Sequence, residues 1–135
     1  MAMIVKNDMI VFCDVDDTLL MWNDVNWQGP GDNQIEITDP TDNSIVHLKP
    51  HVQHIALLKK YQAQGYTVIV WSAAGYRWAD AAVKALKLED VVTLVMSKPL
   101  KYVDDLTAKD ILGNRVYIPF NQVNKIIEPA LPENE

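Results

Sequence analysis

Residues 9–18 read MIVFCDVDDT, five apolar residues followed by three aspartates within four positions. The apolar run contains β-branched and aromatic side chains, which predicts a strand buried on both faces. Asp14, Asp16 and Thr18 come where this strand would end. The carboxyl ends of parallel strands form the ligand crevice of open α/β sheets. The acidic turn after residue 13 is therefore a candidate site.

The rest of the chain alternates between strand and helix patterns. Further strands are predicted at residues 66–71, 91–96, 100–103 and 115–118. Helices are predicted from Pro50 to a C-cap at Gly65, and over residues 75–86. Alternating apolar and polar residues at 34–38 and 44–48 predict a mostly exposed β-hairpin. This order indicates an α/β fold with a largely parallel sheet.

Polar side chains also follow the later predicted strands. Ser72 follows the second strand, Lys98 the third, and Asp104 with Asp105 the fourth. Several carboxylates at one sheet edge cannot all stay ionised without a cation. Hard oxygen ligands in a reducing compartment favour Mg²⁺ as that cation. The sequence thus predicts a metal site that includes Asp14.

These residue types are suited to phosphoryl transfer. Asp14 would bind the metal and attack phosphorus to give an aspartyl-phosphate. Asp16 would protonate the leaving oxygen and later activate water. Ser72 would donate a hydrogen bond to a phosphoryl oxygen, and Lys98 would neutralise charge. Backbone N–H groups would also hold the phosphate, namely those of Asp16, Ala73 and Ala74.

In this order the residues resemble the motifs of haloacid-dehalogenase-superfamily phosphohydrolases. The four motifs are the strand with Asp14-x-Asp16-x-Thr18-Leu19, then Val68-Ile69-Val70-Trp71-Ser72, then Lys98, and finally Tyr102-Val103-Asp104-Asp105. The resemblance spans residues 9–105. It implies a Rossmann-like three-layer sandwich with a mostly parallel sheet, Mg²⁺ dependence and a phosphoaspartate intermediate.

The resemblance also implies how the metal would be held. Asp16 would bind Mg²⁺ through its backbone carbonyl while its side chain acts as acid and base. The resemblance implies that one of Asp104 and Asp105 touches the metal directly. It favours Asp105 for this role, with Asp104 holding Lys98 or a metal-bound water. An aspartate at position 16 favours phosphate ester hydrolysis over dehalogenation, because a dehalogenase needs no such acid.

Members of this family cover the site with a cap inserted after the first motif. Residues 18–48 leave room only for a helical turn and one hairpin, a minimal flap within a single hydrolase domain at 1–128. Residues 129–135 are expected to be a loose tail. The site should be open unless a second subunit of a homo-oligomer covers it. Trp22 and Trp27 would either stack on a substrate ring or anchor the flap.

The distribution of charge excludes several partners. The net charge is -6, and residues 7–48 hold nine acids without Lys or Arg, which leaves 12 basic and 9 acidic residues elsewhere. This balance argues against duplex nucleic acid and against an anionic membrane surface. No apolar run approaches about 18 residues, no signal-peptide core precedes residue 9, and Cys13 is the only cysteine. We expect a cytoplasmic protein with a phosphorylated substrate of unspecified class.

Other interpretations compete with this hydrolase. Cys13 would need an arginine six residues later to act as a cysteine phosphatase, and Leu19 stands there. His47, His51 and His54 are interpreted as solvated side chains rather than metal ligands. A response-regulator receiver domain would need its phosphoacceptor after a middle strand, which here ends in Trp71-Ser72. A catalytically inactive phosphate-binding module on the same fold is a further alternative.

Overall fold

The computed structural model describes residues 9–22, 34–112 and 117–118. The chain divides into two compact units, Met1–Lys98 and Pro99–Glu135. The boundary falls directly after Lys98, so the acidic pair at 104 and 105 belongs to the second unit. A single domain over residues 1–128 stays a prediction, and the predicted tail lies outside the described residues. None of the helices in the described ranges is long and apolar enough to cross a membrane.

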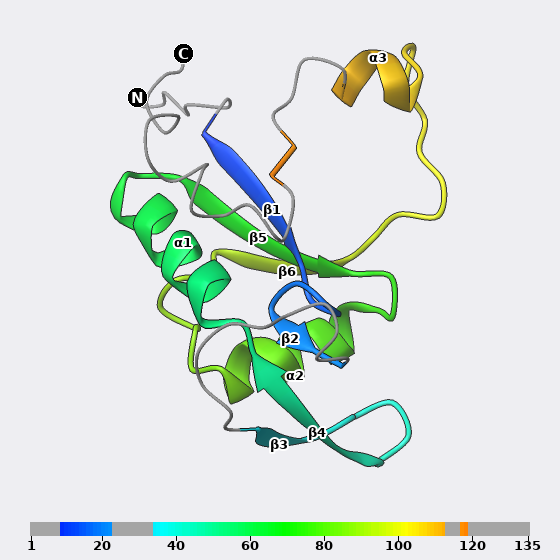
Figure 1. Ribbon diagram of the computed structural model, residues 1–135. Coiled ribbons are helices and arrows are strands. Elements are labelled where there is room, and N and C mark those ends of the chain that lie inside the picture. The colour runs from blue at the N-terminus through cyan, green and yellow to red at the C-terminus, as the bar shows by residue number, and fades with distance from the viewer. Residues whose placement is uncertain (1–8, 23–33, 113–116, 119–135) are drawn as a thin grey trace. The chain divides into compact units, whose positions relative to one another are not determined.

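A parallel three-stranded sheet forms the centre of the first unit (Figure 1). Its strands are β1 (Ile10–Asp14), β5 (Thr67–Ser72) and β6 (Leu94–Ser97), in the order β1-β5-β6. In the register, Asp14 lies beside Trp71, and Ser72 lies beside Ser97. The polar residues that end the three strands are therefore at the same edge of the sheet, and the α/β class is confirmed.

Two helices connect these strands and bury one face of the sheet. Helix α1 (Val52–Ala63) packs on β5, and α2 (Tyr76–Ala85) packs on β5 and β6. Both connections step in the same direction along the sheet, so right-handed crossovers place both helices on one face. Side chains of β5 and α2 that meet there have at most 3% of their surface exposed: Val68, Val70, Ala79, Ala82 and Val83. This face is the hydrophobic core of the unit.

The prediction that β1 is buried on both faces is wrong for the described structure. Ile10 is 40% exposed and Phe12 is 46% exposed, and Leu94 in β6 is 50% exposed. Among the residues that the structure describes, β1 pairs only with β5, and α1 and α2 both lie on the opposite face of the sheet. Within the first unit the described residues thus give a helical layer and a sheet layer.

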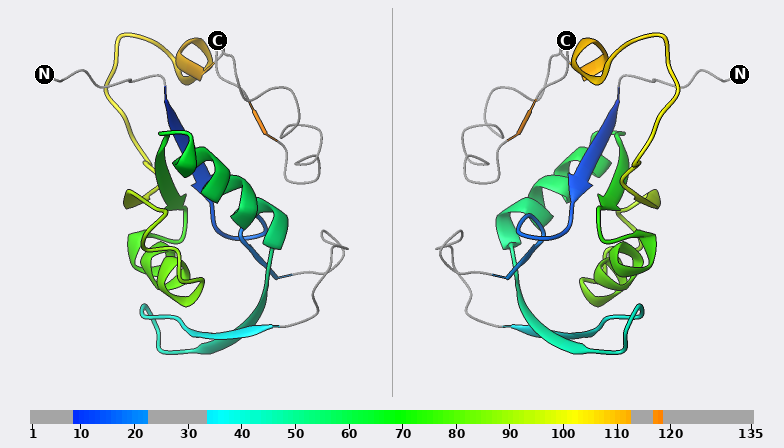
Figure 2. Two further views of the ribbon diagram at one scale, coloured as in Figure 1. Left: turned by 90° about the vertical axis from the view of Figure 1, so that its left-hand side faces the viewer. Right: turned by 90° about the vertical axis from the view of Figure 1, so that its right-hand side faces the viewer.

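The predicted hairpin is confirmed as part of a second, antiparallel sheet. Strands β2 (Leu20–Met21), β3 (Ile35–Thr38) and β4 (Ile45–Pro50) pair in the order β2-β4-β3. Figure 2 shows that β4 curves from the hairpin turn to the start of α1. Most residues between 34 and 48 are exposed, as predicted, and only Ile37 and Leu48 among them are buried, at 4% and 2% exposure. Helix α2 packs on β3 as well as on the parallel sheet.

Several boundaries differ from the predicted ones. Pro50 ends β4 instead of starting the helix, and His51 is the N-cap of α1. Gln64 is the C-cap, and Gly65 follows with a φ of 94°. Strand β6 begins at Leu94 rather than at residue 91. These shifts are of a few residues, and the elements themselves occur in the predicted order.

The second unit lacks the predicted fourth strand. Residues 100–103 have no regular secondary structure, and Leu100 and Val103 are almost fully exposed. A two-residue apolar pair between Lys101 and Asp104 is too short a pattern to specify a strand. Of the predicted fifth strand, residues 115–116 lie outside the described ranges and 117–118 have no regular structure. The unit contains one short described helix, α3 (Ala108–Leu112).

Candidate active site

An ion pair joins the ends of two strands that are not neighbours. Lys98 Nζ lies 3.2 Å from Oδ1 of Asp14, and the backbone N–H of Lys98 donates to the Ser72 carbonyl at 2.9 Å. Asp14 ends β1, and Lys98 directly follows β6, so the pair spans β5. About a third of each side chain is exposed, at 33% for Asp14 and 36% for Lys98. The predicted nucleophile and the predicted cation are therefore together and accessible.

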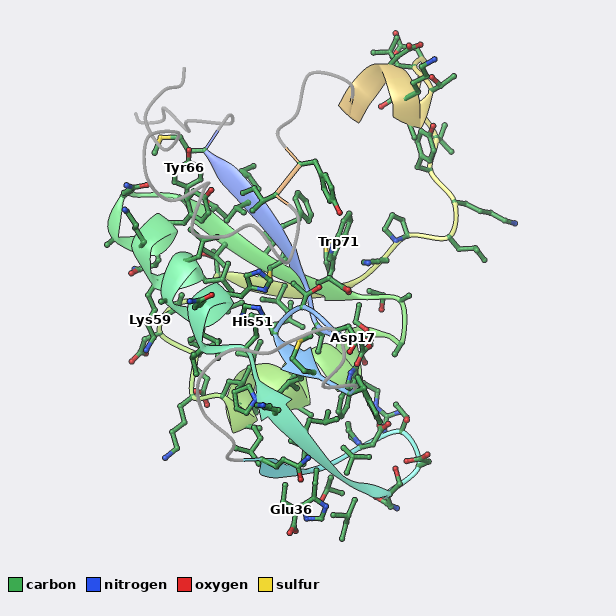
Figure 3. All side chains as sticks on the ribbon, in the orientation of Figure 1. Asp17, Glu36, His51, Lys59, Tyr66 and Trp71 are labelled. Carbon is green, nitrogen blue, oxygen red and sulfur yellow. The ribbon has the colours of Figure 1, made fainter. Side chains whose placement is uncertain are left out.

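An aromatic side chain supports the lysine. Trp71 lies beside Asp14 in the register of β1 and β5. Its ring, labelled in Figure 3, lies 5.8 Å from Lys98 Nζ, and its centroid is 4.4 Å from that of Phe12. A cation near an aromatic ring is attracted by the electrons of the ring face. Trp71 is half-buried at the edge of the site.

The loop after Asp14 is a tight turn with its apolar side chains inside. The Val15 carbonyl accepts N–H groups from Thr18, Leu19 and Leu20 at 2.8–3.1 Å. Val15, Leu19 and Leu20 have no exposed surface. Asp17 adopts a φ of 60°, in the left-handed region that aspartate tolerates better than most residues. Burial of the apolar residues leaves the carboxylates between them on the outside of the turn.

Asp14 has a second polar neighbour within this turn. The Thr18 hydroxyl donates to Oδ2 of Asp14 at 3.4 Å, whereas Lys98 holds Oδ1. The contact with Thr18 is long for a hydrogen bond between oxygens. Oδ2 is thus the less tightly held of the two carboxylate oxygens.

Two indole groups hold the side chain of Asp16. Trp22 Nε1 donates to Oδ1 of Asp16 at 2.8 Å, and Trp78 Nε1 donates to the same oxygen at 3.0 Å. Trp22 directly follows β2, and Trp78 lies in the first turn of α2. Trp78 is buried, and Trp22 anchors its loop to Asp16. Trp27 lies outside the described residues.

Ser72 is fully buried and has a structural partner. Its Oγ accepts the Ala74 N–H at 3.0 Å, and its carbonyl accepts the Gly75 N–H. Gly75 is the N-cap of α2 with a φ of 109°, a conformation that favours glycine. Ala73 and Ala74 are exposed beside it. The turn after β5 thus holds the serine hydroxyl inside, and the Ala74 N–H that was predicted to hold phosphate donates to that hydroxyl in this structure.

Serine 97 supplies a contact that the motifs did not predict. Its Oγ accepts the Tyr76 N–H at 2.8 Å, so the end of β6 caps the start of α2. This bond satisfies one of the N–H groups that a helix N-terminus leaves without a partner in the helix. It fixes the helix start against the sheet edge that carries Lys98.

The prediction that the histidines are solvated is wrong for His51 and His54. His51 has no exposed surface and His54 is 5% exposed, and their rings stack with centroids 3.6 Å apart. His51 Nδ1 accepts the His54 N–H at 3.0 Å, and His54 Nδ1 donates to the Thr18 carbonyl at 2.7 Å. The pair therefore ties α1 to the turn after β1. His47 is exposed and lies 3.5 Å from Glu36.

Cys13 is a poor nucleophile in this structure. Burial, and secondarily the charge of Asp14, raise the pKa of its thiol to about 12. Its thiol donates to the Asp14 carbonyl at 3.4 Å. The thiol therefore stays protonated at neutral pH, which agrees with a structural role.

Asp104 and Asp105 lie in the second unit and are exposed. The Leu106 N–H donates to Oδ1 of Asp104 at 2.9 Å. This bond, followed by a hydrogen bond from Asp105, lowers the pKa of Asp104. Among the residues that the structure describes, no three His, Cys, Asp or Glu side chains form a metal-binding group. Asp14, Asp16, Ser72 and Lys98 are brought together in the first unit.

The partners of Asp16 are the main feature that the motifs did not predict. No motif connects Trp22 and Trp78, which are far apart in the sequence. Their shared role becomes visible only when α2 packs beside the turn after β1. No protein-family model, curated protein or solved structure matches this chain.

Proposed function

We propose that this protein is a Mg²⁺-dependent phosphatase that hydrolyses a phosphate monoester through an aspartyl-phosphate on Asp14. The observation that carries the proposal is the 3.2 Å pair between Asp14 and Lys98 at the shared edge of three parallel strands. A carboxylate nucleophile needs a nearby cation to stabilise the charge of the phosphoryl group. Such an edge is also where a Rossmann-like sheet binds its ligands.

The first step is attack by the less tightly held oxygen of Asp14. As Oδ2 forms a bond to phosphorus, the bond between phosphorus and the leaving oxygen breaks. Lys98 offsets negative charge on the nucleophile and the phosphoryl oxygens. Asp16 transfers a proton to the leaving oxygen, so that an alcohol departs.

The second step reverses the role of Asp16. Its carboxylate takes a proton from a water molecule, and the oxygen of that water attacks phosphorus. The bond between phosphorus and Asp14 breaks, which releases inorganic phosphate and restores the carboxylate. The same side chain serves as acid and then as base, as in other two-step hydrolyses.

The turn after β5 is suited to hold the phosphoryl group. Ala73 and Ala74 are exposed there, whereas the Ser72 hydroxyl is closed off from solvent. Ser72 accepts the Ala74 N–H through its Oγ and keeps its own proton for donation. We propose that Ser72 shapes this turn and that its proton reaches a phosphoryl oxygen when substrate binds.

The oxygen donors of the first unit are of the kind that Mg²⁺ binds. Mg²⁺ binds proteins through one or two carboxylates and keeps several waters. Asp14 supplies one accessible carboxylate, and the backbone carbonyl of Asp16 is a second hard oxygen. The resemblance implies Asp104 or Asp105 as a further ligand, and both residues belong to the second unit. The bound metal would act as a Lewis acid that neutralises charge on the phosphoryl group.

The charge of the hairpin limits the substrate class. Glu36, Asp39 and Asp42 are acidic side chains of the hairpin, and no Lys or Arg occurs between residues 7 and 48. Asp39 and Asp42 accept hydrogen bonds within the turn and so have a structural function as well. A long polyanion such as duplex nucleic acid would be repelled on this side. Compact phosphate monoesters are the substrates we propose.

The test is phosphate release from a panel of monoesters, with p-nitrophenyl phosphate included. We expect continuous turnover with Mg²⁺, loss of turnover with EDTA, and recovery when Mg²⁺ is added back. Asp14→Asn should abolish turnover and keep the circular dichroism spectrum of the wild type. A single stoichiometric phosphorylation without turnover would instead support a receiver-like protein, and binding without chemistry would support an inactive module.

A further inference from the structure

We propose that Trp22 and Trp78 are positioning residues for Asp16, which fix its Oδ1 and present its Oδ2 for proton transfer. The inference rests on the proposed phosphatase function, because it assigns Asp16 an atom for its acid and base steps. Both indole N–H groups donate to the same carboxylate oxygen, at 2.8 Å and 3.0 Å. These distances are typical of well-formed N–H···O hydrogen bonds.

The two tryptophans approach Asp16 from different elements. Trp78 is 3% exposed and is held by the packing of α2, whereas Trp22 is 52% exposed and follows β2. Trp22 is held in turn by its backbone N–H, which donates to Oδ1 of Asp17 at 3.0 Å. Each indole thus has an anchor of its own, independent of Asp16.

The contact uses the polar end of each ring. The ring centroids of Trp22 and Trp78 are 6.3 Å apart and the planes are tilted by 45°. This arrangement is compatible with mutual packing, but packing alone does not require both Nε1 atoms to converge on one oxygen. A core tryptophan would need only one acceptor for its N–H. The convergence indicates that the carboxylate is the group being held.

The chemistry of indole determines what this arrangement does. An indole N–H is a donor only and cannot accept a proton. With two such donors, Oδ1 of Asp16 stays an acceptor in both catalytic steps. The transferred proton therefore resides on Oδ2, and the carboxyl group cannot exchange its oxygens by rotation without breaking both bonds. Fixing a catalytic group in its productive geometry is a recognised source of rate enhancement.

The kinetic test compares Trp22→Phe and Trp78→Phe on two substrates. An alkyl phosphate needs protonation of its leaving oxygen, whereas p-nitrophenolate leaves without much assistance. We expect kcat on the alkyl phosphate to fall about tenfold or more, with KM unchanged. On p-nitrophenyl phosphate we expect a fall of less than about threefold. Trp22 is exposed, so its variant tests the proposal even if Trp78→Phe folds poorly.

A matched control separates positioning from stability. Val83 lies on α2, is 3% exposed and does not contact Asp16 by any hydrogen bond. Val83→Ala should destabilise the helix packing and affect both substrates equally. If the tryptophan variants also lose activity equally on both substrates, the positioning role is overturned.

A spectroscopic test does not depend on turnover. The chain has four tryptophans, so its indole N–H signals in a ¹H–¹⁵N spectrum are few and assignable by substitution. Asp16→Ala should shift the Trp22 and Trp78 signals upfield together and leave the Trp71 signal in place. Unchanged signals would overturn the contact itself. Absence of turnover in the wild type would overturn the phosphatase and with it the proton-transfer role, even if the indole signals respond.

Discussion

Lys98 Nζ contacts Oδ1 of Asp14 across an intervening strand. Asp14 ends β1 and Lys98 follows β6, and β5 lies between these two strands. The lysine reaches over Trp71, whose ring lies 5.8 Å from its charge. This geometry places a cation beside the proposed nucleophile before any substrate binds. Preorganised charge of this kind stabilises a transition state without the cost of reorientation.

Removal of the lysine charge should affect catalysis far more than stability. Lys98→Met is expected to lower kcat/KM by about 10²-fold or more, because charge on the phosphoryl group loses a cation. The free energy of unfolding should change by less than about 1 kcal/mol, since the ion pair is partly exposed. Steady-state kinetics and urea titration measure the two effects.

The control for this variant is another exposed ion pair. Lys84 lies 3.0 Å from Asp80 on α2, away from the strand ends. Lys84→Met should have a similarly small effect on stability and leave turnover near the wild-type rate. Equal kinetic effects of the two substitutions would argue against a role for Lys98 in the chemistry.

Stability should fall at mildly acidic pH because of His51. Burial, and secondarily the charge of His54, lower the pKa of His51 from 6.5 to about 4. Between these values the unfolded chain binds a proton that the folded chain does not, so stability is full above pH 6.5 and is lost as the pH falls toward 4. The complete loss corresponds to about 3 kcal/mol.

Urea unfolding at several pH values measures this dependence. His51→Asn keeps a side-chain oxygen that can accept the N–H at the start of α1. We expect the variant to be less stable at pH 7.5 but to depend less steeply on pH below 6.5. Parallel pH profiles for variant and wild type would show that other groups cause the acid sensitivity.

Loss of the second histidine should loosen the turn after β1. His54→Phe keeps an aromatic ring for stacking but removes the donor to the Thr18 carbonyl, which lies 2.7 Å away. A buried acceptor without its donor costs about 1–3 kcal/mol, measurable by thermal or urea unfolding. Activity should also fall, because the turn carries Asp14 and Asp16. His47→Phe, at an exposed position, should be close to neutral.

The cysteine should resist alkylation in the folded protein. Because the pKa of Cys13 is raised to about 12, little thiolate exists at pH 8. Iodoacetamide should react with the native chain by orders of magnitude more slowly than with the urea-unfolded chain. Cys13→Ala should retain phosphate release. Rapid labelling of the native chain, followed in time by mass spectrometry, would contradict this environment for the thiol.

Much of the first unit was predictable from local patterns. The apolar runs before Asp14, Ser72 and Lys98 identified the three parallel strands, and strict alternation identified the hairpin. These signals are strong because each strand is flanked by polar or turn residues. The exposed face of β1 was not predictable, since an apolar run does not reveal which faces a helix covers.

The surroundings of the site depended on tertiary contacts that no short pattern encodes. Burial of the stacked histidines arises because β4 runs directly into α1, which turns His51 into a cap. The convergence of Trp22 and Trp78 depends on the packing of α2 beside the turn after β1. The predicted strand at residues 100–103 failed for a related reason, because two apolar residues do not specify pairing without a partner strand.

Two hydrogen bonds around the candidate site join segments that are remote in sequence. Trp78 and Asp16 are 62 positions apart, and His54 and Thr18 are 36 positions apart. Contacts of such range close large loops and form late relative to helices and hairpins. A refolding chain should therefore recover its helical signal before its tryptophan environment, and the candidate site should be among the last parts of the first unit to assemble. A nascent chain would lack this arrangement until residues beyond α2 had left the ribosome.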